Sequence, residues 1–224
     1  MRLLSRADYA SLIDGAQLLR EDLHGPKVYL TPDGRIVKLF RVKRWWSSSM
    51  LYPYSLRFKH NAQRLRRRGF TCVQVDQAFV CPAIRRHGII YRRMDGDPID
   101  ELLLREGETS LDVYLGYAAF IARLHARRVY FRSLHPGNVL LLADGGHGLI
   151  DVGDVRFPWL PLSAARRRRN FRHLLRSEEM HAVLQRYPAT DFVDAYLAAS
   201  ALPAQAEASL RADLLTDFAA AARR

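Results

Sequence analysis

Short apolar stretches separated by turn residues fill the first half of the chain, a pattern typical of β-strands. Apolar residues at 27–30 and 36–40 flank the sequence Thr-Pro-Asp-Gly-Arg at 31–35. Because Pro-Asp-Gly favours a tight turn, we expect these two stretches to pair as a hairpin. The apolar stretches at 72–80 and 89–93 predict two more strands.

One helix is expected among these strands. Phe58, Ala62 and Leu65 recur at helical spacing, and Gly69 marks the end of the pattern. Ser55 precedes the first of them and is a residue type that commonly caps a helix. The pattern therefore predicts a helix that Ser55 caps and that ends near Gly69.

The second half of the chain is mainly helical in pattern. A capping-box pattern followed by apolar residues on one face predicts a helix over 109–124. The stretches 139–142 and 148–151 flank an Asp-Gly-Gly turn and should form a short hairpin. Further helices are expected after Thr190, a candidate cap, and near Pro203.

The order of these elements predicts an α+β fold in one domain over 1–224, since no repeat or linker divides the chain. The turn-rich sequence at 95–98 separates the two halves. We expect a strand-rich N-lobe over about 20–94, with a small antiparallel sheet, and a helical C-lobe over 95–224.

Composition and charge narrow the setting. The chain has 224 residues, of which 49% are hydrophobic, and a formal net charge of +12. Such a charge favours a phosphate-bearing partner, whether nucleotide, nucleic acid or anionic lipid. Cys72 and Cys81 lack metal-ligand spacing and are expected to be free core thiols. The sequence shows no signal peptide and no membrane span, which predicts a cytoplasmic protein.

Arginine accounts for most of the positive charge. The largest cluster comprises Arg166, Arg167, Arg168, Arg169, Arg172 and Arg176. Because Phe171 and neighbouring leucines are interleaved with it, the segment predicts an amphipathic cationic helix that contacts anionic lipid or a phosphorylated glycan. A solvated helix face is the alternative. Trp45 and Trp46 are further candidates for a membrane interface, or for packing in the core.

The most informative motif spans 129–141 and 149–153. In the protein-kinase catalytic loop, an Asp stands five residues before an Asn that binds a metal ion, and a second metal-binding Asp opens a triplet downstream. Asn138 and Asp151 match the two metal ligands, and Asp151 follows Asn138 by thirteen residues, a common kinase spacing. Ser133 occupies the position of the first Asp.

The strand around Lys38 resembles the lysine strand of protein kinases, in which a lysine binds nucleotide phosphates. More narrowly, residues from about 20 to 200 resemble the lipopolysaccharide-kinase (InaA-like, or toluene tolerance) family, best over 124–153. This resemblance implies a two-lobed protein-kinase-like fold with ATP between the lobes. It also implies that Lys38 binds the phosphates and that Asn138 and Asp151 bind Mg²⁺.

The remaining nucleotide contacts are expected at the two edges of the predicted sheet. Gly25 and Val28 stand where kinases have a glycine-rich turn, although only one glycine is present. The backbone from Arg92 to Met94 is expected to contact the adenine.

Several positions depart from the kinase pattern. Ser133 cannot act as a carboxylate base, and Phe131 replaces the usual His of the loop. A general base contributes roughly two to four orders of magnitude in rate. His135 or the substrate itself could replace it. The predicted helix after Ser55 also offers no Glu to pair with Lys38, and its helical phase places Asn61 nearest.

The residues leave two main functions open. One is an ATP-dependent kinase that phosphorylates a lipopolysaccharide-core sugar or related envelope glycolipid at the cytoplasmic face of the inner membrane. The other is a pseudokinase that binds nucleotide or serves as a scaffold, because Ser133 replaces the catalytic Asp. A basic nucleic-acid-binding protein is a minor alternative, since the chain has no recognisable DNA- or RNA-reading motif.

Overall fold

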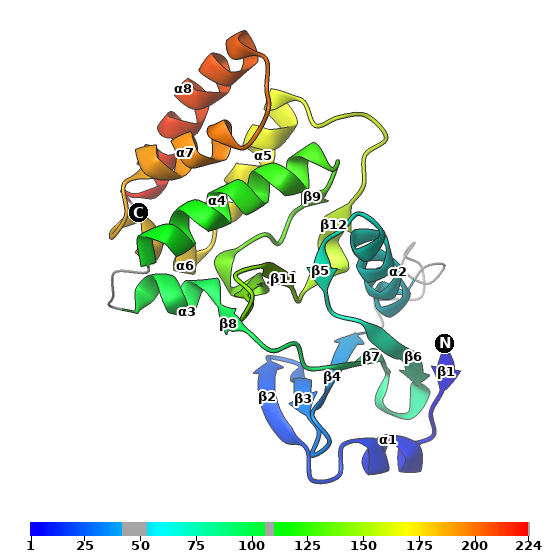
Figure 1. Ribbon diagram of the computed structural model, residues 1–224. Coiled ribbons are helices and arrows are strands. Elements are labelled where there is room, and N and C mark those ends of the chain that lie inside the picture. The colour runs from blue at the N-terminus through cyan, green and yellow to red at the C-terminus, as the bar shows by residue number, and fades with distance from the viewer. Residues whose placement is uncertain (42–52, 106–109, 224) are drawn as a thin grey trace. The chain divides into compact units, whose positions relative to one another are not determined.

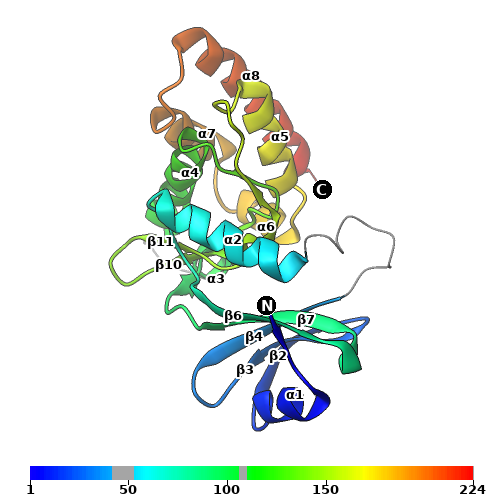
Figure 2. The ribbon, with the colours of Figure 1, turned by 90° about the vertical axis from the view of Figure 1, so that its right-hand side faces the viewer.

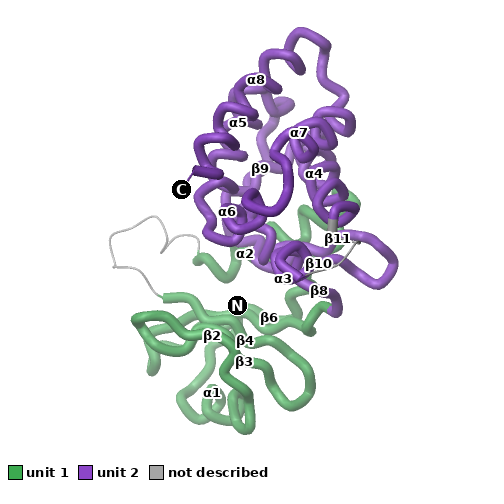
Figure 3. The backbone as a smooth tube through the Cα atoms, turned by 90° about the vertical axis from the view of Figure 1, so that its left-hand side faces the viewer, with its two compact units in different colours: residues 1–94 green, residues 95–224 purple. Residues whose placement is uncertain are grey.

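The computed structural model describes residues 1–41, 53–105 and 110–223. Trp45, Trp46 and position 109 therefore lie outside the described residues. The chain divides into two compact units, Met1–Met94 and Asp95–Arg224, shown in green and purple in Figure 3. The first is built around a sheet and the second is mainly helical, which confirms the predicted α+β class.

The first unit contains a six-stranded sheet in the order β1-β6-β7-β4-β3-β2. Its strands are β1 (Arg2–Leu3), β2 (Gln17–Asp22), β3 (Gly25–Leu30), β4 (Arg35–Arg41), β6 (Val75–Cys81) and β7 (Arg86–Arg92). The hairpin of β3 and β4 is confirmed, with Val28 opposite Lys38. The sheet is antiparallel except at one edge, where β1 runs parallel to β6.

Helices cover both faces of this sheet (Figure 2): α1 (Arg6–Leu12) on one side and α2 (Tyr54–Arg67) on the other. Side chains alternate along β4. Val37 and Leu39 join the apolar cluster on the α1 side, against which Tyr9 packs. Phe40 lies on the α2 side, where its ring centroid is 6.2 Å from that of Phe58. Lys38, two positions before Phe40, therefore belongs to the α2 face.

The predicted cap of α2 is wrong. The helix begins at Tyr54, after Pro53, and Ser55 is a buried residue of its first turn. The backbone N–H of Ser55 donates to Nδ1 of His87, on β7, at 3.4 Å. Burial also lowers the pKa of His87, which favours the neutral ring that can accept this bond. A tertiary contact thus takes the place of the expected local cap.

The second unit combines a helical bundle with short strands (Figure 1). Its helices are α3 (Ile99–Leu104), α4 (Ser110–Ala126), α5 (Ala164–Leu174), α6 (Glu178–Leu184), α7 (Ala189–Ala198) and α8 (Ala204–Ala221). Its strands are β8 (Asp97–Pro98), β9 (Tyr130–Phe131), β10 (Val139–Leu141), β11 (His147–Leu149) and β12 (Val155–Arg156). The predicted hairpin is confirmed as β10 and β11. No helix within the described residues has the length and apolar character needed to cross a membrane.

The start of α7 also differs from the prediction. Thr190 lies inside the helix, and Pro188 occupies the capping position. Proline suits the entry to a helix because its fixed φ and missing N–H cost little there. The last helix, α8, follows Pro203 as expected.

Aromatic rings fill the core between α5, α7 and α8. The ring centroids of Phe171 and Tyr196 lie 4.7 Å apart, and those of Phe192 and Phe218 lie 5.5 Å apart. The two cysteines, Cys72 in β5 (Thr71–Cys72) and Cys81, are free and buried, as predicted. Burial raises the pKa of the Cys72 thiol to about 12, so this thiol stays protonated.

A buried polar network joins this core to β9. Asn170, on α5, acts as a side-chain partner for the backbone of Phe131: its Oδ1 accepts the Phe131 N–H at 3.2 Å, and its Nδ2 donates to the Phe131 carbonyl at 2.7 Å. Because Nδ2 is used in this way, His125 must donate its Nε2–H to Oδ1 of Asn170, at 3.1 Å. The loop that follows Phe131 is thereby fixed to α5.

The other side of the same network reaches α7. Nδ1 of His125 accepts from the Tyr196 hydroxyl at 2.8 Å, and that hydroxyl accepts from the Arg167 guanidinium at 3.1 Å. Arg167 also donates to the Leu162 carbonyl at 3.0 Å. Complete burial lowers the pKa of His125 to about 3, so its ring is neutral at physiological pH.

The predicted cationic helix is therefore only partly available to an outside partner. Arg167 is buried in the network above, and Arg168 pairs with Asp213 at 2.6 Å and Asp217 at 2.7 Å, both on α8. Arg172 pairs with Asp217 at 3.0 Å. The side chains of Arg166, Arg169 and Arg176 are exposed.

Replacement of Asn170 by Ala tests the network. The variant leaves the Phe131 backbone and His125 without their partners in a buried site, and each such group costs about 1–3 kcal/mol. We expect the free energy of unfolding, measured by urea denaturation, to fall by about 3 kcal/mol. Arg169→Ala, at an exposed position of the same helix, is the control and should change it by less than about 0.5 kcal/mol. Equal effects of the two changes would contradict the role given to Asn170.

His147 provides a second, pH-dependent test. Its ring stacks on Phe120 with centroids 4.7 Å apart, and both of its nitrogens are buried without a hydrogen-bond partner among the described residues. Burial lowers its pKa from 6.5 to about 4. Between these values the unfolded chain binds a proton that the folded chain does not, so stability decreases as the pH falls below 6.5.

Replacement of His147 by Phe keeps the stack and removes both the unpartnered nitrogens and this titration. We expect thermal denaturation to show a Tm about 2–4 °C higher at neutral pH, with a larger difference near pH 5. His24→Phe, at an exposed position, should leave Tm nearly unchanged. A gain that does not grow as the pH is lowered would show that His147 is not the titrating group.

Candidate functional site

The β10–β11 hairpin brings Asn138 and Asp151 to the same end of two paired strands. Val139 lies opposite Leu149 in the ladder. One residue further out, the Ile150 N–H donates to the Asn138 carbonyl at 3.1 Å. Asn138 and Asp151 therefore lie next to this last cross-strand bond, although thirteen residues separate them in sequence.

The side chain of Asn138 is fixed in orientation. It is 6% exposed, and its Nδ2 donates to the Ser133 carbonyl at 2.8 Å. This bond uses Nδ2, so the side-chain oxygen of Asn138 takes no part in it. Asn138 thus offers an amide oxygen and Asp151 a carboxylate, which are hard oxygen donors of the type that Mg²⁺ prefers when phosphates and water complete its shell. The residues present therefore fit the expected magnesium ion.

Larger metal-binding clusters are not found in the described part of the chain: no group of three or more His, Cys, Asp or Glu side chains is placed to hold a metal ion.

Ser133 has a partner that the sequence analysis did not assign. Its hydroxyl donates to Oδ2 of Asp154 at 3.2 Å. Asp154 ends a single 3-10 turn over Val152–Asp154, and the next two residues form β12, which pairs with β9 so that Val155 lies opposite Phe131. The strand pairing thus brings a carboxylate within hydrogen-bond distance of Ser133, the residue at the position of the kinase Asp.

His135, the other predicted catalytic residue, has its Nδ1 close to Gly137. A Cβ atom built on Gly137 would lie 2.7 Å from Oδ2 of Asp100 and 3.4 Å from Nδ1 of His135. Nδ1 of His135 and Oδ1 of Asp100 are buried without a hydrogen-bond partner among the described residues. Glycine at 137 allows these two groups to approach the loop, and the described contacts of His135 are made here.

Lys38 lies in the first unit, on the α2 face of β4. It is 8% exposed, and its Nζ is 5.6 Å from the centroid of the Phe58 ring. α2 contains no acidic residue, so the Lys-Glu pair of protein kinases cannot come from this helix. Asn61, one turn beyond Phe58 on the same face, is buried. Lys38 is thus held on an apolar surface that limits its contact with water.

Gly25 and Val28 belong to one hairpin. Asp22 lies opposite Gly25 at its end, which makes the connection between β2 and β3 very short. Gly25 has φ +96°, a conformation that favours glycine, and the backbone N–H of His24 donates to the Asp22 carboxylate at 2.8 Å. The predicted phosphate-covering segment is therefore a tight turn with one glycine.

Arg92 is the last residue of β7, opposite Arg35 on β4, and Met94 is the last residue of the first unit. Between them, the backbone N–H of Arg93 donates to the Gly34 carbonyl at 3.2 Å. This N–H is therefore used within the sheet, and the predicted contact with adenine would depend on the backbone groups of Arg92 and Met94.

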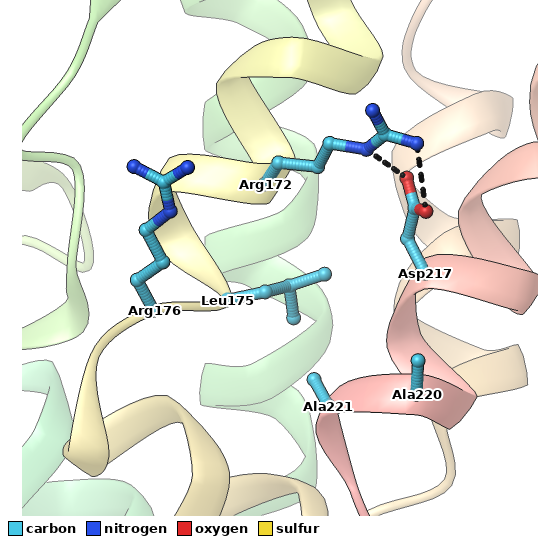
Figure 4. A pocket seen from close by; sticks show the side chains of 6 residues that line it. All are labelled: Arg172, Leu175, Arg176, Asp217, Ala220 and Ala221. Carbon is cyan, nitrogen blue, oxygen red and sulfur yellow. Dashed lines mark hydrogen bonds and ion pairs between the residues drawn. The ribbon is translucent and has the colours of Figure 1, made fainter.

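A separate pocket of about 210 Å³ lies between α5 and α8 (Figure 4). Its lining residues are Arg172, Leu175, Arg176, Asp217, Ala220 and Ala221. It is smaller than the 300–1,000 Å³ usual for ligand pockets, and an ion pair of Arg172 with Asp217 forms part of its wall. None of the predicted site residues lines it.

No family model matches the chain, and no curated protein matches it. Among solved structures, the chain is similar to WbdD in complex with the kinase inhibitor LY294002, with a TM-score of 0.49 and 14% identity over 88% of this chain and 43% of WbdD. It is also similar to WbdD described as a bifunctional kinase-methyltransferase, with a TM-score of 0.45 and 16% identity over 88% and 42% of the two chains. The chain thus spans less than half the length of these neighbours, and similarities of this size assign it no activity.

Proposed function

We propose that this protein is a kinase-like phosphotransferase that binds magnesium and ATP. The proposal is carried by one observation: the β10–β11 ladder holds Asn138 beside Asp151, and the bond from Asn138 to the Ser133 carbonyl directs its side-chain oxygen away from the loop. An amide oxygen and a carboxylate on neighbouring residues are the kind of oxygen donors that a magnesium-phosphate site uses.

Lys38, with its buried stem, would bind phosphate oxygens, and Asn138 and Asp151 would hold Mg²⁺. When bound, the ion neutralises charge that develops on the transferred phosphoryl group. Phosphoryl transfer depends mainly on such positioning and charge neutralisation, so the protein needs little covalent chemistry of its own.

We further propose that the acceptor is a sugar hydroxyl of a lipopolysaccharide core or a related anionic glycolipid. The support is the resemblance of residues 124–153 to the lipopolysaccharide-kinase (InaA-like) family, together with the net charge of +12. A cytoplasmic protein that associates with the inner membrane surface would suit this acceptor. Of the proposed contact residues Arg166 to Arg169, Arg166 and Arg169 have exposed side chains, which supports their part in this contact.

The alternative is a pseudokinase that binds nucleotide without transferring phosphate. Ser133 favours it, because a hydroxyl at the loop position cannot accept a proton as a carboxylate does. The two functions share the nucleotide site and differ only in turnover.

Thermal denaturation with and without magnesium and ATP tests the shared site. At about 100 times the Kd, a ligand stabilises the folded state by about 2.7 kcal/mol, which corresponds to a rise in Tm of about 5–10 °C. We expect this rise in the natural chain. Lys38→Ala should lose most of it, and Asp151→Asn should lose the part that depends on magnesium.

Lys59→Ala, on α2, and Asp144→Asn, in the turn between β10 and β11, are matched controls that should keep the full rise. The Asn at 144 can still accept the backbone N–H of Gly146, the bond that Asp144 makes at 2.9 Å. If the natural chain shows no rise, or if Asp151→Asn keeps its magnesium dependence, the proposed function fails.

A further inference from the structure

This sequence lacks the carboxylate of the kinase catalytic loop, but the structure places another carboxylate beside Ser133. Ser133 holds the position of the catalytic Asp, and its hydroxyl donates to Oδ2 of Asp154 at 3.2 Å. This bond joins two segments that lie twenty-one residues apart in sequence. We propose that Asp154 is the general base of the phosphoryl transfer; this inference rests on the proposed function.

Two sets of contacts fix Asp154 relative to the loop. The pairing of β9 with β12, with Val155 opposite Phe131 and Arg156 opposite Tyr130, holds the residue after Asp154 in register with the residues before Ser133. From the other side, Asn138 donates to the Ser133 carbonyl at 2.8 Å. The Asp154 carboxylate is therefore positioned with respect to Asn138, one of the two proposed magnesium ligands.

The lengths of the two side chains allow Asp154 to serve in place of an Asp at 133. An Asp at 133 would have its Cγ close to where the Ser133 hydroxyl oxygen lies, and its carboxylate oxygens one bond further out. Oδ2 of Asp154 lies one hydrogen-bond length from that hydroxyl oxygen. A general base needs to be within hydrogen-bond reach of the proton that it accepts. A small shift of the acceptor hydroxyl toward Asp154 satisfies this condition.

His135 is a weaker candidate for the same role. Its described contacts lie toward Gly137 and Asp100, and its Nδ1 is buried there. Asp154 instead bonds directly to the side chain at the loop position that defines the site. The geometry thus favours the carboxylate over the imidazole.

The proposed step conserves atoms and charge. The oxygen of the acceptor hydroxyl forms a bond to the γ-phosphorus of the nucleoside triphosphate, and the bond from that phosphorus to the oxygen bridging it to the β-phosphate breaks. The nucleoside diphosphate leaves with the bonding electron pair. The proton of the hydroxyl passes to the Asp154 carboxylate, and Ser133 orients that carboxylate by donating to it.

The test measures transfer of labelled γ-phosphate from magnesium-ATP to purified lipopolysaccharide-core glycolipid by the full chain. Asp154→Asn retains the size of the side chain and can still accept from Ser133. We expect its kcat to fall about 100-fold or more, while KM for ATP and the rise of Tm with magnesium-ATP stay unchanged. A structural role alone would change the Tm rise together with kcat.

An exchange of the two side chains tests position as well as identity. The double variant Ser133→Asp with Asp154→Ser returns the carboxylate to the kinase position, and we expect at least a tenfold higher kcat than in Asp154→Ser alone. Ser133→Asp by itself should give no gain, because two carboxylates about 3 Å apart cannot both ionise easily. Asp144→Asn is the matched control and should keep full activity.

Each outcome separates the inference from the function on which it rests. Transfer that persists within threefold in Asp154→Asn overturns the role of Asp154 and leaves the kinase function standing. A natural chain that binds magnesium-ATP but transfers no phosphate overturns the general base and favours the pseudokinase. Absence of binding overturns the proposed function itself.

Discussion

The two hydrogen bonds between the Asn170 side chain and the backbone of Phe131 are the constraint on which the site depends. They fix the start of the loop at β9, a strand of two residues that makes few hydrogen bonds to a neighbouring strand. His125, Tyr196 and Arg167 complete the network, and each polar atom described in it has a partner. A buried network that is fully satisfied favours one arrangement, since any other leaves polar groups without partners.

Because the loop is fixed through its backbone, its side chains are free to differ from the kinase pattern. Phe131, which stands in place of the usual His, is completely buried. Its bonds to Asn170 are made by its backbone and do not depend on the side chain. Likewise, Asn138 binds the carbonyl of Ser133 and not its side chain. The orientation of Asn138 therefore does not depend on an Asp at 133, so Asn138 can remain in place in an altered loop.

Local sequence signals predicted the hairpins of the fold but not the starts of α2 and α7. The Pro-Asp-Gly and Asp-Gly-Gly turns determine β3–β4 and β10–β11 because their conformation depends on adjacent residues. Ser55 was a wrong cap because His87, thirty-two residues away, accepts the N–H that a local cap would satisfy. The pattern of charges in α5 has a similar limit. Its pattern cannot show that Arg167 is buried by Tyr196 or that Arg168 pairs with α8.

The same contrast between local signals and long-range contacts applies to the candidate site. Asn138 and Asp151 could be predicted because a short hairpin, itself visible in the sequence, determines their proximity. Asp154 could not be assigned, because its position depends on the two-residue pairing of β9 with β12, which carries almost no sequence signal. The turn over Val152–Asp154 thus places a carboxylate beside Ser133, outside the loop that the motif describes. A motif that lacks its catalytic residue therefore describes only the loop. Whether activity is lost depends on the residues that other segments bring to the site.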